Sequence, residues 1–215
     1  MKLNKLSLVS LLGLAATLSA STAHATITTY TDRATFLGLL QPGYFEDTFS
    51  DVTNGGIVGA SATRSGGGFS VTYTAPPDGL YSTTGGMSTA EATNNLVATL
   101  GGSNIYAVGG YFFLTDIGGN FQPFAGNSVS AFASNGIDPD ASLSAAVNSA
   151  TNFFGWISTT PILTVTENSG GVSPSRWNTL DNFIVGAATV PEPGTLALLA
   201  LGVVALVRRR HKSVP

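Results

Sequence analysis

The sequence predicts an all-β protein, an antiparallel β-sandwich with one short N-terminal helix, held between two apolar ends. Short segments alternate apolar and polar residues with a period of two, as half-buried strands do. Clusters of Gly, Ser, Thr and Asn separate these segments, and such clusters are typical of turns. Only one segment of the central region has the spacing of a helix, which favours a sandwich over a parallel sheet with crossover helices.

The N-terminus has the three parts of an export signal. Met1–Lys5 is basic, residues 6–18 are mostly apolar, and Ala23 and Ala25 form the small-x-small pattern that signal peptidase reads. A buried N-terminal helix is the alternative, but the order and lengths of the three parts favour a signal helix. We therefore predict that residues 1–25 are a signal peptide, cleaved after Ala25.

The predicted domain covers residues 26–186 and begins with its helix. Residues 31–40 place apolar side chains on one stripe, with Thr31 as the N-cap and Asp32 in the first turn. Gly109 and Gly110 interrupt a long apolar segment and indicate a central strand with a bulge or kink. The expected strands are residues 69–74, 105–114, 128–134, 152–158, 162–167 and 179–185.

The C-terminus, residues 187–215, combines three signals. Pro191, Glu192 and Pro193 end the preceding strand in a stiff, extended segment. An apolar run follows, and by length alone it could be a buried helix. Arg208, Arg209 and Arg210 directly after it are typical of a stop-transfer signal. We therefore predict a transmembrane helix over about residues 194–207 and a basic cytoplasmic tail.

This tripartite end resembles the PEP-CTERM sorting signal of Gram-negative bacteria, on the residues just named. The resemblance implies an exosortase substrate, in which Pro191, Glu192 and Pro193 are read by a membrane-embedded processing enzyme. It further implies export through the inner membrane, a transient anchor there with the C-terminus in the cytoplasm, and then a place at the cell surface or outside the cell. Signal peptidase and exosortase are thus the expected processing partners.

The central domain is similar to the β-sandwich ectodomains common among PEP-CTERM proteins. The segments that carry this resemblance are Gly109–Phe112, Phe153–Ile157 and Leu180–Val185. The last of them is also similar to the closing strand of jelly-roll domains of the galactose-binding type, several of which bind carbohydrate. The resemblance implies a jelly-roll-like sandwich and leaves the function open, because a fold does not determine a function.

The amino-acid composition of the central domain excludes several classes of function. Between Thr26 and Thr189 the chain has eleven Asp and Glu, three Arg and no Lys, His or Cys, which gives a formal charge of −8. Nucleic acid is excluded as a partner, because its binding depends on Lys and Arg. Catalysis through His, Cys or Lys is excluded as well. We expect no enzyme; a secreted glycoside hydrolase that uses a carboxylate pair is the weakest alternative.

Two kinds of binding site stay open. Calcium needs only hard oxygen ligands, so a structural calcium ion is expected, if anywhere, at Glu46, Asp47 and Asp181 or at Asp138 and Asp140. The competing interpretation of these acids is hydrogen bonding to nearby backbone in turns or at a strand start. Apart from calcium, no cofactor is expected.

Trp177 is the aromatic residue most readily exposed for a ligand, since it stands between Arg176 and Asn178, whereas Trp156 has the apolar neighbours of a core residue. Packing at an edge strand is the alternative for Trp177. The sequence therefore predicts an exported, non-enzymatic structural or adhesive protein, linked by the family resemblance to exopolysaccharide or biofilm. The alternative is a carbohydrate-binding module, with or without calcium, whose partner is a polysaccharide.

Overall fold

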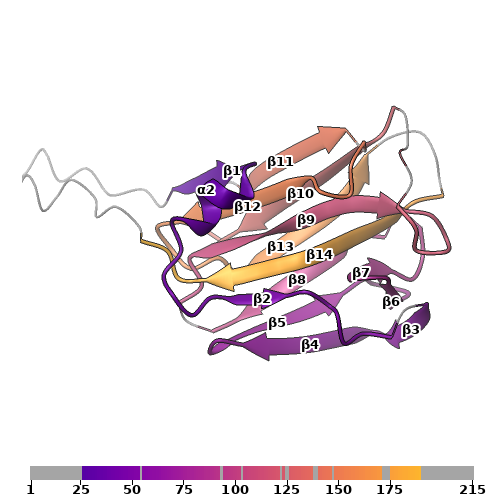
Figure 1. Cartoon of the computed structure of the whole chain (residues 1–215), viewed down its shortest axis with the longest axis horizontal. Coiled ribbons are helices and arrows are strands. Elements are labelled where there is room, and N and C mark those ends of the chain that lie inside the picture. The colour runs from indigo at the N-terminus through magenta and orange to yellow at the C-terminus, as the bar shows by residue number, and fades with distance from the viewer. Residues whose placement is uncertain are drawn as a thin grey trace, which may run out of the picture. The chain divides into compact units, whose positions relative to one another are not determined.

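The structure is a computed structural model that describes residues 26–189, except residues 54, 93, 103, 122, 124, 125, 138, 139, 147 and 171–174. Ala25–Val190 forms one compact unit. Its strands are antiparallel and form two packed sheets (Figure 1), which confirms the prediction of an all-β sandwich. All members of its two apolar clusters lie between Ile27 and Ala188, so this unit contains its own core.

The first sheet has eight strands in the order β1-β12-β9-β14-β7-β6-β3, and β2 pairs with β14 beside this path. Its central strands β9 and β14 are the longest, and most of their residues are buried. The strands are β1 (Ile27–Tyr30), β2 (Phe45–Asp47), β3 (Gly56–Gly59), β6 (Leu80–Thr83), β7 (Gly86–Thr89), β9 (Ala107–Thr115), β12 (Phe153–Ser158) and β14 (Trp177–Gly186).

The second sheet has six strands in the order β11-β10-β13-β8-β5-β4. β5 and β10 keep the alternation that predicted them, because one face packs on the first sheet and the other meets solvent. The strands are β4 (Ser61–Gly66), β5 (Phe69–Thr74), β8 (Leu96–Gly101), β10 (Ser128–Ser134), β11 (Ala141–Ala146) and β13 (Thr164–Gly170).

The main core fills the space between the sheets. The ring of Phe112 stacks on that of Phe154 with centroids 5.4 Å apart, and Trp156 meets Phe112 edge to face at 5.8 Å. Trp156 is fully buried, which confirms its predicted place in the core. Burial of these rings removes a large apolar area from water and holds the two sheets together.

The helix, α2 (Arg33–Leu37), is shorter than predicted, and its N-cap is Asp32 instead of Thr31. The carboxylate of Asp32 accepts a hydrogen bond from the amide of Thr35 at 2.7 Å, as an N-cap does. Gly38 caps the other end and stops the helix there. Phe36 is buried in a second apolar cluster on the outer face of the first sheet, against Phe153.

The predicted irregularity at Gly109 and Gly110 exists, but the extra residue lies on the neighbouring strand. The pairing of β14 with β9 shifts between Asp181 and Ile184, opposite Tyr111 and Gly109. A side chain at Gly109 would place its Cβ 2.8 Å from the ring of Phe153. The glycine is therefore needed for the close approach of that ring, and β14 carries the bulge.

Two sequence predictions need correction in detail. β13 begins at Thr164 instead of residue 162 and runs to Gly170 instead of residue 167, so Leu163 lies just before the strand and is 48% exposed. Strands β1–β4, β6–β8 and β11 were not predicted.

Among residues 26–189, as far as they are described, no helix is long and apolar enough to cross a membrane. The predicted signal and transmembrane helices lie outside the described residues.

Candidate functional site

A pocket of about 470 Å³ opens where the chain leaves the last strand of the domain. Its size falls within the range of about 300–1,000 Å³ that is usual for small-molecule sites. None of its lining residues is charged. They are Gln41, Pro42, Gly43, Tyr44, Gly67, Gly68, Phe69, Gly102, Asn104 and Ala187.

Four glycines with positive φ give this pocket walls of bare backbone. At Gly67, φ is 58°, and an added Cβ would lie 2.3 Å from the carbonyl oxygen of Gly43. The turn between β4 and β5 therefore packs directly on the segment before β2. Glycine permits both the backbone conformation and this approach, and it leaves amide and carbonyl groups open to a ligand.

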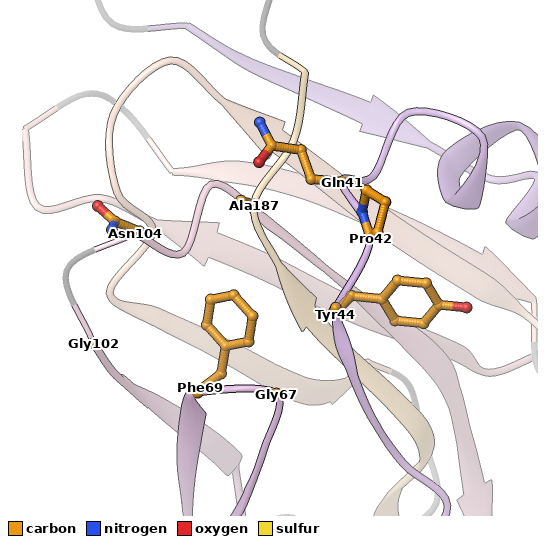
Figure 2. Close-up of a pocket in the computed structure, with 10 residues that line it drawn as sticks. Gln41, Pro42, Tyr44, Gly67, Phe69, Gly102, Asn104 and Ala187 are labelled. Carbon is orange, nitrogen blue, oxygen red and sulfur yellow. The ribbon is translucent and has the colours of Figure 1, made fainter.

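Rings and amides provide the side-chain chemistry of the pocket. Figure 2 shows the ring of Phe69 standing between Asn104 and the backbone of Tyr44, whose own ring points away from Phe69. Gln41 and Asn104 have exposed side chains, and each amide offers both donors and an acceptor. The combination suits an uncharged ligand with hydroxyl groups and apolar faces.

A second, smaller pocket of about 110 Å³ contains Trp177, the predicted ligand-binding residue. It lies on the outer face of the first sheet, at the start of β14. Trp177 is partly buried, and its indole nitrogen donates a hydrogen bond to the carbonyl oxygen of Ala90 at 3.3 Å. Tyr81, on β6, is a second ring in the same lining.

The structure brings the predicted calcium ligands Glu46, Asp47 and Asp181 near one another, because β2 pairs with β14. Each already has a partner. Glu46 accepts two hydrogen bonds from Arg33, at 2.7 and 2.9 Å, and Asp47 forms an ion pair with Arg64 at 2.7 Å.

The carboxylate of Asp181 accepts hydrogen bonds from the backbone and side-chain amides of Asn182. Burial raises the pKa of Asp181 to about 6, and the charges of Glu46 and Asp47 act in the same direction, against these hydrogen bonds. Asp181 thus forms hydrogen bonds with nearby backbone, which is the predicted alternative to calcium binding. It does so at the bulge of β14 and not at the start of a strand.

Within the described part of the chain, no three His, Cys, Asp or Glu side chains form a group that could hold a metal ion. For the other predicted calcium pair, Asp140 is exposed and Asp138 lies outside the described residues. Calcium binding therefore stays a prediction. At Asp116, in contrast, the carboxylate accepts hydrogen bonds from the amides of Gly118 and Asn120, at 2.9 and 3.0 Å, which is turn chemistry.

The chain leaves the domain beside the larger pocket. Leu40 and Ala188 form an antiparallel bridge, and the amide of Gln41 donates to the carbonyl oxygen of Ala187 at 2.9 Å. Thr189 bonds to the carbonyl oxygen of Leu39 through its amide and its hydroxyl, both at 3.0 Å. Residues 187–189, the first of the predicted C-terminal sorting signal, are thus held against the domain.

The sequence that follows Thr189 carries Pro191-Glu192-Pro193, an apolar run and three arginines. Residues 189–210 match the PEP-CTERM protein-sorting motif. The PEP-CTERM motif implies an exported protein of a Gram-negative bacterium that exosortase sorts. This confirms the recognition made from the sequence. The individual roles of Ala23, Ala25, Pro191–Pro193 and Arg208–Arg210 stay predictions, because these residues lie outside the described residues.

No curated protein matches the chain in sequence. Among solved structures, the chain is similar to TmCBM61, a structure solved in complex with β-1,4-galactotriose. The two share 8% sequence identity over 75% of this chain and 88% of the other, with a TM-score of 0.26.

Sequence reasoning predicted Trp177 as a ligand-binding residue, which stays a prediction, and missed the larger pocket. Gln41 and Asn104 come from segments more than sixty residues apart and meet only through the packing of loops at one end of the sandwich. The available signal was the set of glycines at residues 66–68 and 101–102, which marks turns but does not show which turns lie together.

Proposed function

We propose that this protein is delivered to the cell surface by exosortase sorting and has a non-enzymatic, adhesive role in an exopolysaccharide matrix. In this proposal the pocket of Figure 2 contacts the matrix by binding an uncharged glycan. The observation that carries the proposal is the neutral lining of a pocket that lies directly beside the exit to the sorting motif.

The chemistry of the pocket favours a neutral glycan over other small ligands. Sugar hydroxyls can pair with the amides of Gln41 and Asn104, while the ring of Phe69 meets an apolar sugar face. The domain's formal charge of −8 discourages acidic polymers.

The lining residues of the two pockets also support a role in binding without catalysis. Glycoside hydrolysis needs two carboxyl groups on either side of the scissile bond. No carboxylate lines the larger pocket, and Asp116 is the sole carboxylate among the lining residues of the smaller one. Of the acids that lie within a few residues of the lining, Glu46 and Asp47 are paired with arginines, and Glu91, which follows Ala90 of the smaller pocket, is exposed.

Binding is tested with the unit of residues 26–190, titrated with exopolysaccharide purified from the producing strain. The double variant Gln41→Ala/Asn104→Ala should weaken binding by tenfold or more, since each lost polar contact contributes about 1 kcal/mol. Asn148→Ala removes an exposed amide that lies outside both pockets and is the matched control. Equal binding by the double variant and the control would reject the pocket.

Sorting is tested separately in cells. In a strain without exosortase, the protein should retain its C-terminal tail and accumulate in the membrane fraction. Normal removal of the tail in that strain would refute the processing route. A titration repeated with a calcium chelator determines whether binding needs calcium.

A further inference from the structure

We propose that the outer face of the first sheet, at the start of β14, is a second binding site for uncharged polysaccharide. Trp177 and Tyr81 are its two rings, and it shares no residue with the pocket of Figure 2. The inference deepens the proposed function, because it assigns the same class of ligand to a different face of the domain.

The ring of Trp177 is held in place before any ligand arrives. Its indole nitrogen donates to the carbonyl oxygen of Ala90 at 3.3 Å, which restricts rotation of the ring. The backbone of Tyr81 is fixed by the β6 pairing, opposite Ser88 on one side and Ile57 on the other. Because the Trp177 ring is already restrained, a ligand that packs on it loses little additional side-chain entropy there.

A chain of buried hydroxyls forms the floor between the rings. Thr115 and Thr179 share a hydrogen bond of 2.9 Å, Thr179 donates to Ser88 at 3.0 Å, and Ser88 donates to the carbonyl oxygen of Asn178 at 3.1 Å. The hydroxyl of Thr179 also lies 3.2 Å from the carbonyl oxygen of Trp177. Ser88, Thr115 and Thr179 are at most 1% exposed, so their hydroxyls are satisfied within the protein and form a fixed floor beneath the two rings.

The rim is apolar and open. Ile57 is 71% exposed and Ile117 is 80% exposed, one on each side of the rings. Apolar side chains beside two aromatic rings match the apolar face of a pyranose ring, and the carboxylate of Asp116 in the same lining can accept a hydrogen bond from a sugar hydroxyl. The pocket volume of about 110 Å³ is too small to enclose a ligand but suits a polymer lying across the sheet.

The two sites lie at opposite ends of β14 (Figure 1). Trp177 is the first residue of that strand, and Ala187 of the larger pocket follows its last residue. Ten residues of strand span roughly 30 Å, so one short oligosaccharide cannot occupy both sites. The domain can therefore hold two polymer chains at once, or two distant points on one chain.

The test uses native gel electrophoresis of the 26–190 unit in gels that contain dextran, galactan, galactomannan or the strain's own exopolysaccharide, with polygalacturonate as the acidic comparison. Trp177→Ala should lower affinity for the bound neutral polymer about tenfold, as expected for the loss of one aromatic contact. Trp177→Phe should restore most of the loss. Ile137→Ala removes a 76%-exposed apolar side chain that lies outside both pockets and is the control.

Fluorescence provides a readout that needs no variant. The chain has two tryptophans, and Trp156 is fully buried, so acrylamide quenches chiefly Trp177. A saturating neutral polymer should protect this fluorescence from acrylamide. Binding without such protection, together with unchanged affinity of Trp177→Ala, would overturn the second site.

The outcomes distinguish the two proposals. If Trp177→Ala has no effect and Gln41→Ala/Asn104→Ala abolishes binding, the second site fails and the proposed function stands. If Trp177→Ala abolishes binding and Gln41→Ala/Asn104→Ala has no effect, the second site stands and the larger pocket is not the adhesive site. If no neutral polymer, including the strain's own, retards the protein, both assignments fail.

Discussion

Arg64 holds the buried carboxylate of Asp47, with its Nε 2.7 Å from Oδ2 and 2.8 Å from Oδ1. The same carboxylate accepts a hydrogen bond from the hydroxyl of Tyr73 at 3.1 Å. Arg64 also pairs with Asp51, and its guanidinium lies over the ring of Phe49 at 5.6 Å. Arg64, on β4 of the second sheet, thus compensates the negative charge of Asp47, on β2 of the first sheet.

Arg64→Met should destabilise the domain by about 3 kcal/mol, because it leaves the carboxylate of Asp47 buried without its cation. Urea denaturation measures the loss. The matched control is Arg33→Met, which breaks the more exposed pair with Glu46 and should cost less than about 1 kcal/mol. Asp47→Asn added to Arg64→Met should recover part of the stability; equal losses in the two single variants would contradict this account.

The native domain should become less stable as the pH rises, and Glu167→Gln should remove this pH dependence. Burial raises the pKa of Glu167 well above 4.5, with one opposing hydrogen bond from the amide of Thr179. The folded state therefore binds a proton that the unfolded chain releases, so stability is full below pH 4.5 and falls above it, by at most about 1.4 kcal/mol per pH unit. Unfolding free energies at pH 4–8 should decline in the native chain and be flatter in the variant; parallel curves would refute it.

Asp181→Asn should change the pH dependence in a narrower window. The pKa of Asp181 is raised to about 6, so its favourable contribution is complete below pH 3.8 and is lost as the pH rises through 6. The side chain is partly exposed, and solvent screening reduces the effect to the order of 1 kcal/mol. Thermal unfolding of both proteins at pH 4 and pH 7 gives the difference, and an effect confined to pH above 7 would be inconsistent with it.

Gly67→Ala should damage the larger pocket, whereas Gly68→Ala should largely spare it. Both glycines have positive φ, which costs an alanine about 1 kcal/mol. Only at Gly67 would the new Cβ also collide with backbone, 2.3 Å from the oxygen of Gly43; at Gly68 it meets nothing within 4 Å. We expect a stability loss above about 2 kcal/mol and weaker glycan binding for Gly67→Ala alone. Identical behaviour of the two variants would show that the contact with Gly43 is unimportant.

The long strands of the sandwich could be predicted because their packing leaves a local trace. Val71 and Tyr73 on β5 are buried and alternate with less buried neighbours, so the period of two is visible in the sequence. β7 shows no such period, since all four of its residues are buried, two of them as hydrogen-bonded hydroxyl side chains. Short strands of this kind depend on neighbours that are remote in sequence.

The two pockets show the same contrast between features with a local sequence pattern and features that depend on residues remote in sequence. The partial exposure of Trp177 could be predicted from its polar neighbours, but Tyr81, in the same pocket lining, is almost a hundred residues away and is brought to that face by the β6-β7-β14 pairing. The helix N-cap was misplaced by one residue, because Thr31 and Asp32 are both good caps and only the geometry shows that Asp32 accepts from Thr35.

β14 joins the point where a polymer is proposed to bind to the point where the sorting tail leaves. Its hydrogen bonds to β9, β7 and β2 run across the strand direction. While the chain is still anchored through its C-terminal end, tension between a captured polymer and that anchor would therefore act parallel to the strand and load these ladders in shear, so that many bonds must fail together. A domain held in this way can resist mechanical force without a disulfide or a metal ion.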